Sequence, residues 1–413
     1  MCNVKNKILF NIFTDGYPNL TAGGPNNIIY KIINNHSSKS YQFDYLSSDL
    51  FKENLDKSNL PTMMHDRTSK KKMTVHLSEK SSLYRKIFSS DFYIPYHFYK
   101  KSNYFKSFQS RSLNYQILHC QDSIALSLIA HPNCKSKKIV TIHSKGSLSD
   151  ELKNMARNEN LRRKIELRLK NIEKRTLEEA DVITFPSKAA KNYFENSMGK
   201  VLNEDKTRII YNGIDLELIQ NIEQDLMILS KYKIEKNDKT LLLFNIAAHT
   251  KAKNIDILLN AIALLKNKYK KEVLLVNAGV GDLTDELKGL SKKLQIDKNV
   301  KFLGKIPNED ILSLLKVISI FIMTSEKVIF DLVVLEALAS GACAVVSNEG
   351  GNCEIIRDGV NGFLIEIDDP ESIAHKLITI NPDSVKENAK KTASRFSVNK
   401  MINDYFELYD SLL

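Results

Sequence analysis

The sequence lacks the features that would place it in a membrane or in a disulfide-stabilised class. No run of 18 apolar residues occurs among its 413 residues, so no segment is expected to span a bilayer. Its five cysteines are an odd number, are scattered, and include no C-x-x-C pair. This usage excludes a disulfide framework, argues against a zinc site, and favours the reducing cytoplasm.

Positive charge is distributed unevenly along the chain. The formal net charge is +11, with +15 on residues 1–200 and −4 on residues 201–413. A basic first half favours an anionic partner, such as a lipid-phosphate acceptor, an acidic membrane surface or nucleic acid. No nucleic-acid-binding motif accompanies this charge, so nucleic acid ranks last and is not a predicted partner.

The most informative stretch is residues 318–362. Its apolar run, 318–323, is short and rich in β-branched residues, which is typical of a buried parallel strand. A helix is expected next, with Gly341 in the place of a C-cap glycine. Glu336 is the one carboxylate within that apolar helix. Burying it without a hydrogen bond would cost roughly several kcal/mol. The pattern therefore indicates a polar ligand at Glu336.

Here the chain resembles a known family. The pattern S-x(5)-F-x-L-V-x-L-E-A-x-A-x-G, then a strand and G-G-x-x-E-I-I-x-D-G-x-N-G-F-L, resembles the donor-binding half of the family 4 retaining glycosyltransferases, which have the GT-B fold. The resemblance implies that Glu336 hydrogen-bonds the ribose of a nucleotide-sugar. The first glutamate of the family's Glu-x7-Glu pair is replaced by Val328. Glu326 and Asp331 are the nearby carboxylates that are candidates to take its place.

A histidine closes the buried strand expected over 138–143. In open α/β sheets ligands collect at the carboxyl ends of strands, so His143 is a site candidate. Taken alone, His143 is better interpreted as a core-edge histidine that hydrogen-bonds the backbone. The T-x-H pattern also matches the family, and the resemblance implies that His143 lines the cleft beside the donor sugar.

Two segments are expected to hold the donor diphosphate. Gly23 and Gly24 precede a helix, where backbone N–H groups can approach a phosphate, although such a pair is more often only a turn. Lys253 matches the lysine of the family's R-x(4)-K-G loop, with Ala248 at the arginine and Asn254 at the glycine. The resemblance implies that Lys253 binds the diphosphate as a point charge.

The segment 300–306, V-K-F-L-G-K-I, matches the family's V-x-F-L-G-x-[VI]. In the family the backbone after this glycine contacts the nucleobase. The resemblance therefore assigns Gly304 and Ile306 to donor binding, together with Val333 near the ribose-binding glutamate.

Aromatic residues recur densely between residues 84 and 115 and alternate with basic ones. One interpretation is that helices pack these aromatic faces into the first domain. The other is an interfacial surface, on which Tyr and Phe enter the headgroup layer while Lys100, Lys101 and Lys106 meet lipid phosphates. Both can hold together, and the second predicts peripheral contact with an anionic membrane.

These patterns predict an α/β protein of the GT-B fold. Two Rossmann-like domains would face a central cleft, and a C-terminal helix would cross back to the first domain. Residues 1–205 with 386–413 would form the acceptor-binding domain, and residues 206–385 the nucleotide-sugar-binding domain.

The predicted activity is a retaining, metal-independent transfer of a hexosyl unit from a nucleotide-diphosphate sugar, expected to be UDP-linked. The acceptor would be a glycan or lipid-linked glycan in the assembly of cell-surface polysaccharide or glycoconjugate. No cofactor is predicted, and the protein is expected in the cytoplasm, at the inner face of the membrane if the basic aromatic segment binds lipid. Two alternatives stay open. One is a non-catalytic glycan-binding or partner-stabilising protein, which Val328 and Ala248 favour, and the other is a GT-B epimerase or phosphorylase.

Overall fold

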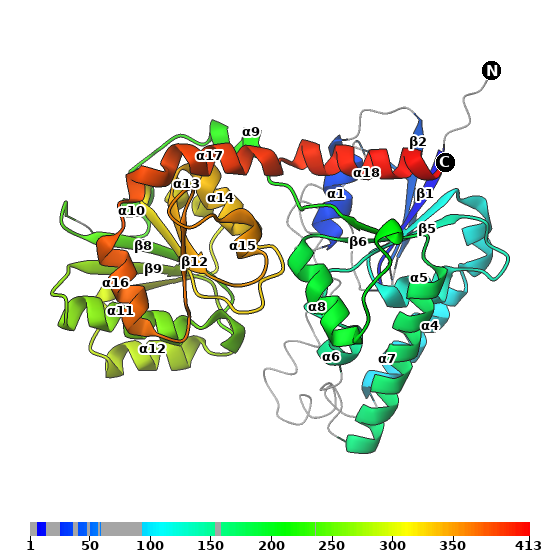
Figure 1. The fold of residues 1–413 in the computed structure, drawn as a ribbon, viewed down its shortest axis with the longest axis horizontal. Coiled ribbons are helices and arrows are strands. Elements are labelled where there is room, and N and C mark those ends of the chain that lie inside the picture. Colours follow the sequence, from blue (N-terminus) through cyan, green and yellow to red (C-terminus); the bar gives the residue numbers. More distant parts are fainter. Residues whose placement is uncertain are drawn as a thin grey trace. The chain divides into compact units, whose positions relative to one another are not determined.

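The computed structural model describes most of the chain, namely residues 6–13, 25–35, 40–47, 50–56, 58, 93–152, 158–235 and 237–413. The chain divides into two compact units (Figure 1). Unit 1 comprises Met1–Tyr211 and Met401–Leu413, and unit 2 comprises Asn212–Lys400. Each unit is a Rossmann-like layer of mostly parallel strands flanked by helices, as the sequence predicts.

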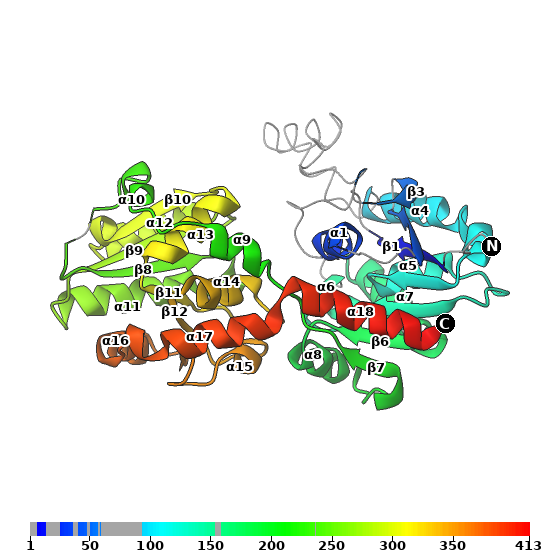
Figure 2. The same ribbon diagram turned by 90° about the horizontal axis from the view of Figure 1, so that it is seen from above.

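Unit 1 is built on a seven-stranded sheet in the order β3-β2-β1-β4-β5-β6-β7. Every neighbouring pair is parallel except β2 and β3. Its strands are β1 Asn6–Asn11, β2 Tyr41–Leu46, β3 Phe51–Leu55, β4 Ile117–Cys120, β5 Lys137–Thr141, β6 Val182–Phe185 and β7 Thr207–Ile209. Its described α-helices are α1 Pro25–Asn35, α4 Tyr93–Lys106, α5 Ser123–Ile129, α6 Leu148–Leu152, α7 Glu159–Glu179 and α8 Lys188–Met198. The α5 helix packs against both α4 and α7 (Figure 2).

Unit 2 has a six-stranded parallel sheet in the order β10-β9-β8-β11-β12-β13. Helices α11, α12 and α16 cover one face, and α13, α14 and α17 cover the other (Figure 1). Its strands are β8 Leu241–Ile246, β9 Val273–Ala278, β10 Val300–Gly304, β11 Ile320–Met323, β12 Cys343–Ser347 and β13 Phe363–Ile365. Its α-helices are α9 Leu216–Asn221, α10 Met227–Lys231, α11 Ile255–Asn267, α12 Thr284–Lys293, α13 Asn308–Val317, α14 Leu332–Ser340, α15 Asn352–Ile355, α16 Pro370–Thr379 and α17 Lys386–Ala393.

The most informative stretch of the sequence folds as strand, helix, strand. The predicted strand over 318–323 corresponds to β11, and the next strand is β12. Gly341 ends α14 with a φ of +84°, which confirms the predicted C-cap glycine. Residues on both strands are fully buried, as expected for a parallel sheet with helices on each face.

The division into units differs from the predicted domain boundaries. The sequence suggested that 386–413 accompanies the first domain, whereas residues as far as Lys400 belong to unit 2. The predicted single helix is broken: α17 ends at Ala393, a short 3-10 turn follows, and α18 spans Val398–Leu412. From Met401 onward α18 belongs to unit 1, where Tyr409 is fully buried. Within the described residues, no helix has both the length and the hydrophobicity needed to cross a bilayer.

Candidate functional site

Two loops at the carboxyl ends of β8 and β11 are tied together by hydrogen bonds. The Thr324 hydroxyl donates to the carbonyl oxygens of Lys253 (2.9 Å) and Asn254 (3.1 Å). The N–H of Glu326 donates to the carbonyl oxygen of Ala252 at 2.9 Å. Since β8 and β11 are adjacent strands, both loops leave the same end of the sheet. These bonds fix the backbone that carries Lys253.

The turn that carries Lys253 has an unusual conformation. Lys253 closes a short 3-10 helix, and α11 begins at Ile255. Between them Asn254 has a φ of +48°, in the left-handed region. Asparagine enters this region more readily than other non-glycine residues. Asn254 can therefore take the position that glycine has in the resembling motif.

Close backbone approaches hold the same loops from two other sides. A Cβ on Gly279 would lie 1.9 Å from the carbonyl oxygen of Ala247, and a Cβ on Gly351 would lie 2.0 Å from that of Ile329. The N–H of Gly351 also donates to the carbonyl oxygen of Val328 at 2.8 Å. Only glycine fits at these two positions, because any side chain would collide with backbone.

The structure brings two of the predicted site residues together. The ammonium nitrogen of Lys253 lies 3.4 Å from Oδ2 of Asp331, which precedes α14. The two side chains are 22% and 29% exposed. Position 328, where the family glutamate is expected, is a valine that is only 2% exposed. A carboxylate therefore already faces the lysine that the sequence assigns to the diphosphate.

The other described donor-site candidates belong to α14 and to the end of β10. Glu336 lies in α14 between buried Leu335 and Ala337 but is itself partly exposed, so its carboxylate is not enclosed in the core. Val333, in the first turn of α14, is partly exposed as well. Gly304 ends the edge strand β10 with a φ of +71°. The partly buried Ile306 follows it, and Gly23 and Gly24 lie outside the described residues.

His249 follows Ala248, where the resembling motif has arginine, but it offers no charge to the site. It is 1% exposed, with its Nε2 2.7 Å from Oδ1 of Asn277 and its Nδ1 2.8 Å from the Thr284 hydroxyl. The amide of Asn277 in turn donates to Oδ1 of Asn245 at 2.8 Å. Burial lowers the pKa of His249, which keeps the ring neutral. His249 thus anchors the loop that carries Lys253.

In unit 1 a chain of side chains holds His143. This residue lies two positions beyond β5, because the strand ends at Thr141 rather than at the predicted residue 143. Its Nε2 is 2.9 Å from Oε1 of Gln121, and Nε2 of Gln121 is 3.1 Å from Nε2 of His119. Nδ1 of His119 is 2.8 Å from the hydroxyl of Tyr409 in α18. We call these four residues the histidine relay.

The relay fixes the tautomers of its two imidazoles. An amide oxygen only accepts and an amide nitrogen only donates, so His143 carries its proton on Nε2. His119 accepts on Nε2 and donates from Nδ1 to Tyr409. Burial lowers the pKa of His143 to about 4, and burial with the neighbouring His143 lowers the pKa of His119 to about 3. Both rings are therefore neutral at pH 7.

Sequence reasoning identified His143. It indicated His119 and Gln121, at the end of the preceding strand, only weakly, and it gave no sign of Tyr409. Tyr409 is separated from His119 by 290 positions, and no motif links them. This contact forms only because α18, at the end of the chain, packs in unit 1.

The basic aromatic segment is described in part, through α4. Lys100 and Lys106 are exposed, Lys101 is partly buried, and Tyr99 is 65% exposed. Phe105 on the same helix is fully buried. Among its described side chains, the helix therefore buries Phe105 in unit 1 and presents basic residues on its surface. Contact with lipid stays a prediction.

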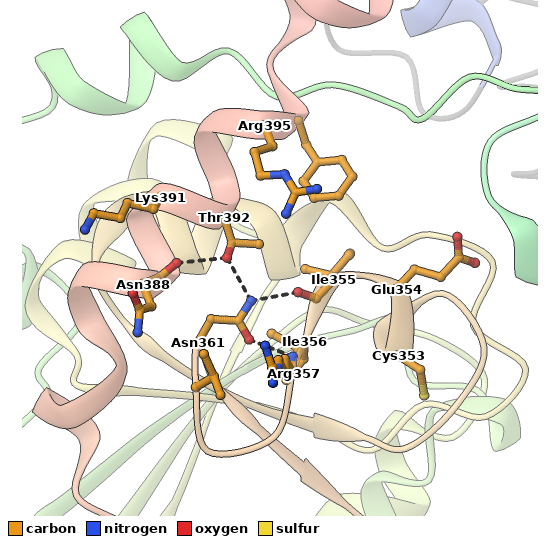
Figure 3. Close-up of a pocket in the computed structure, with 12 residues that line it drawn as sticks. Cys353, Glu354, Ile355, Ile356, Arg357, Asn361, Asn388, Lys391, Thr392 and Arg395 are labelled. Carbon is orange, nitrogen blue, oxygen red and sulfur yellow. Dashed lines mark hydrogen bonds between the residues drawn. The ribbon is translucent and has the colours of Figure 1, made fainter.

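A separate pocket in unit 2 has a volume of about 340 Å³ and includes three basic residues, Arg357, Lys391 and Arg395, in its lining (Figure 3). The amide of Asn361 donates to the Ile355 carbonyl at 2.9 Å and to the Thr392 hydroxyl at 2.8 Å. Lys391 and Arg395 stand at the carboxyl end of α17, where cations complement the helix dipole. The fold itself thus accounts for most of the polar lining of this pocket.

Two protein-family models match the chain. The model described as Glycosyltransferase Family 4 matches residues 77–218, and the model described as Glycosyl transferases group 1 matches residues 229–397. Among solved structures, Anabaena HepE in complex with UDP has a TM-score of 0.67 at 19% identity, covering 98% of this chain and 100% of that one. This similarity confirms the predicted GT-B fold.

Curated relatives share parts of their sequence with this chain. N-acetyl-alpha-D-glucosaminyl L-malate synthase of Bacillus anthracis is 28% identical over 253 residues, 59% of this chain and 63% of the relative. The N-acetylgalactosamine-N,N'-diacetylbacillosaminyl-diphospho-undecaprenol 4-alpha-N-acetylgalactosaminyltransferase of Campylobacter jejuni is 31% identical over 211 residues, 49% of this chain and 53% of the relative. The chain thus spans less than two thirds of the length of each.

Proposed function

Because this chain belongs to the family 4, group 1 glycosyltransferases, we propose that it transfers a hexosyl unit from a UDP-linked sugar to a glycan or lipid-linked glycan with retention of anomeric configuration. The product would enter a cell-surface polysaccharide or glycoconjugate. The observation that carries this proposal is Lys253, a partly buried cation on a loop fixed by the bonds from Thr324 and Glu326.

The donor and acceptor classes are proposed from the relatives. Anabaena HepE was solved with UDP and with UDP-glucose. The Campylobacter jejuni relative is named for a diphospho-undecaprenol acceptor. A UDP-sugar and a lipid-linked glycan are therefore the substrates to test first, and the excess of basic residues in 1–200 suits an acceptor that carries phosphate.

In the proposed mechanism the chain stabilises charge that develops on the leaving diphosphate. Lys253, with the amides of Gly23 and Gly24, would supply that stabilisation electrostatically, so no divalent metal is required. Glu336 would bind the ribose, and Gly304 and Ile306 would contact the base through their backbone. Glu326 and Asp331 are the carboxylates available near the reacting sugar.

His143 would act on the sugar as a neutral hydrogen-bonding group. Its lowered pKa keeps it uncharged at pH 7, and its Nε2 proton is committed to Gln121. Nδ1 is then the acceptor nitrogen, which suits a sugar hydroxyl. His119, Gln121 and Tyr409 would be positioning residues for this ring.

One observation favours a second candidate function, a non-catalytic GT-B protein that binds a glycan or stabilises a partner. Lys253 is paired with Asp331, Val328 is buried, and Ala248 supplies no cation. The pairing of Lys253 and the absence of a cation at Ala248 leave less positive charge to offer a diphosphate, and Val328 leaves the site without the family's first glutamate. Donor binding distinguishes the two functions.

The test is calorimetric titration of the full chain with UDP, GDP and a panel of UDP-sugars. We expect one nucleotide to bind with a micromolar dissociation constant. In Lys253→Ala the affinity for it should fall by at least about tenfold, because a charge-assisted contact to phosphate is removed. Lys251→Ala is the matched control, since Lys251 lies on the same 3-10 turn but is exposed.

The outcomes separate the two functions. Binding that Lys253→Ala abolishes and Lys251→Ala preserves supports the glycosyltransferase. Turnover of the bound donor in EDTA, with an α-linked product from an α-linked donor, would support the retaining, metal-independent reaction. No binding by any nucleotide would favour the non-catalytic protein.

A further inference from the structure

Asp331 does not behave as other aspartates at helix starts in this chain do. It is the N-cap residue of α14, with extended φ and ψ, yet its side chain makes no capping hydrogen bond. By contrast, Asp122 accepts from the N–H of Ala125 at 2.7 Å, and Asp215 accepts from the N–H of Leu218 at 3.0 Å. The carboxylate of Asp331 is directed to Lys253 instead.

The charge of Lys253 is therefore already matched inside the protein. The pair joins loops that follow two adjacent strands, with 78 positions of sequence between the residues. Both side chains are partly buried, so solvent screens them only in part. A second cation is missing at Ala248, and His249 beside it is neutral. A diphosphate that binds Lys253 must therefore compete with the carboxylate of Asp331.

We propose that Asp331 is an internal anion that occupies the place of a diphosphate oxygen on Lys253, and that donor binding must displace it. This inference rests on the proposed function of Lys253. Displacement has a defined destination, because Asp331 already stands at the N-cap position of α14, where the backbone N–H groups of the first turn favour an anion. The site thus has two states, one with Asp331 on Lys253 and one with Asp331 on α14.

The two states are close in free energy on physical grounds. A partly exposed ion pair contributes little net stability, and an N-cap hydrogen bond contributes a similar amount. Asp331 therefore lowers donor affinity without preventing binding. It also sets a threshold, because only a ligand with enough negative charge and enough other contacts displaces it.

The test compares Asp331→Asn with the parent chain by titration with UDP and with inorganic pyrophosphate in EDTA. Asparagine keeps the capping group and removes the charge, so we expect about tenfold tighter binding of both ligands. Asp256→Asn is the matched control: it is exposed in the first turn of α11, three positions from Lys253, and carries the same charge change. We expect it to change affinity by less than about twofold.

Several outcomes would overturn the inference and leave the proposed function intact. One is that the parent chain binds UDP and Asp331→Asn binds it no more tightly. Equal affinity would mean that Asp331 does not compete with the ligand, and weaker affinity would mean that it assists binding. Another is an equal gain in Asp256→Asn, which would indicate a general charge effect. A third is that Mg²⁺ raises the affinity of the parent chain for UDP but not that of Asp331→Asn. This result would indicate that a cation bridges Asp331 and the diphosphate.

Failure of the proposed function gives a different result. If neither chain binds any nucleotide or pyrophosphate, the diphosphate site and the inference fall together. Pyrophosphate binding that appears only in Asp331→Asn would support the internal anion even when the parent chain binds no nucleotide.

Discussion

The two units hold their candidate site residues by different means. In unit 1, His143 is positioned by side chains that pass hydrogen bonds from Gln121 through His119 to Tyr409. In unit 2, Lys253 is positioned mainly by its backbone, which accepts from Thr324. The arrangement in unit 1 depends on the identity of the hydrogen-bonding side chains. The arrangement in unit 2 depends on positions where two backbone segments lie in close contact. Each should therefore fail under a different kind of substitution.

The largest loss of stability is expected at Gly351 in unit 2, where there is no room for a side chain. Gly351→Ala would place a Cβ 2.0 Å from the carbonyl oxygen of Ile329, so the loop after β11 or β12 must move. We expect the free energy of unfolding of unit 2 to fall by about 3 to 5 kcal/mol, measured by chemical denaturation.

Gly289→Ala is the control for this change. Gly289 lies inside α12, and an added Cβ would meet no atom within 4 Å. Alanine there should raise stability by about 0.5 to 1 kcal/mol, because it favours helix. Equal, small effects of the two substitutions would contradict the backbone account of unit 2.

A smaller loss is expected when the histidine relay is cut. His119→Ala leaves the buried Tyr409 hydroxyl and the Gln121 amide without their shared partner. We expect the free energy of unfolding of unit 1 to fall by about 2 to 4 kcal/mol. Hydrogen exchange can locate the loss in unit 1, and a loss confined to unit 2 would disprove the role given to His119.

The relay also predicts a pH dependence. The pKa of His119 falls from 6.5 in its ordinary state to about 3 in the folded protein. Its contribution is therefore fully present above about pH 6.5 and is lost as the pH falls toward 3, because the unfolded chain binds the proton first. The slope of stability against pH in this range should be shallower in His119→Ala.

The smallest effect is expected at Glu173 in α7. This carboxyl is fully buried, its Oε2 has no hydrogen-bond partner, and burial raises its pKa from 4.5 to about 7. Its contribution to stability is present below about pH 4.5 and is lost as the pH rises through about 7. Glu173→Gln should thus be more stable than the parent chain at pH 8, by about 1 to 2 kcal/mol.

The comparison at two pH values supplies the control for Glu173. At pH 4.5 the carboxyl is neutral in the folded protein and only half ionised in the unfolded chain, so the substitution should have little effect there. A difference that is the same at pH 4.5 and pH 8 would show that the carboxyl does not titrate as the structure indicates.

The sequence predicted features that repeat at short range. Apolar runs marked β11 and β12, and the glycine after α14 marked its end. Lys253 was found because it matches the lysine of the family's R-x(4)-K-G loop. His143 was found because it follows a strand, where sheet ends collect ligands, and matches the family's T-x-H pattern. These signals depend on residues a few positions apart, and one sequence is enough to read them.

Features that depend on long-range contacts were not predictable. Asp331 was expected as a stand-in for the glutamate replaced by Val328, and nothing in the pattern indicated its pairing with Lys253. The break between α17 and α18 was missed for a related reason: Ser397 pairs with Ile214 across most of unit 2, and that bridge fixes the turn. Such contacts are set by topology and leave no local pattern.

The participation of α18 in unit 1 has a consequence for the order in which the chain folds during synthesis. Unit 2 is continuous, from Asn212 to Lys400, so all of its strands have been made before α18. Unit 1 is begun first, but its buried Tyr405 and Tyr409 and the last partner of His119 arrive only with residues 401–413. Domains usually fold from the N-terminus as they emerge from the ribosome. In this protein we expect the later-made unit to reach its native packing first, and the earlier-made unit to wait for α18.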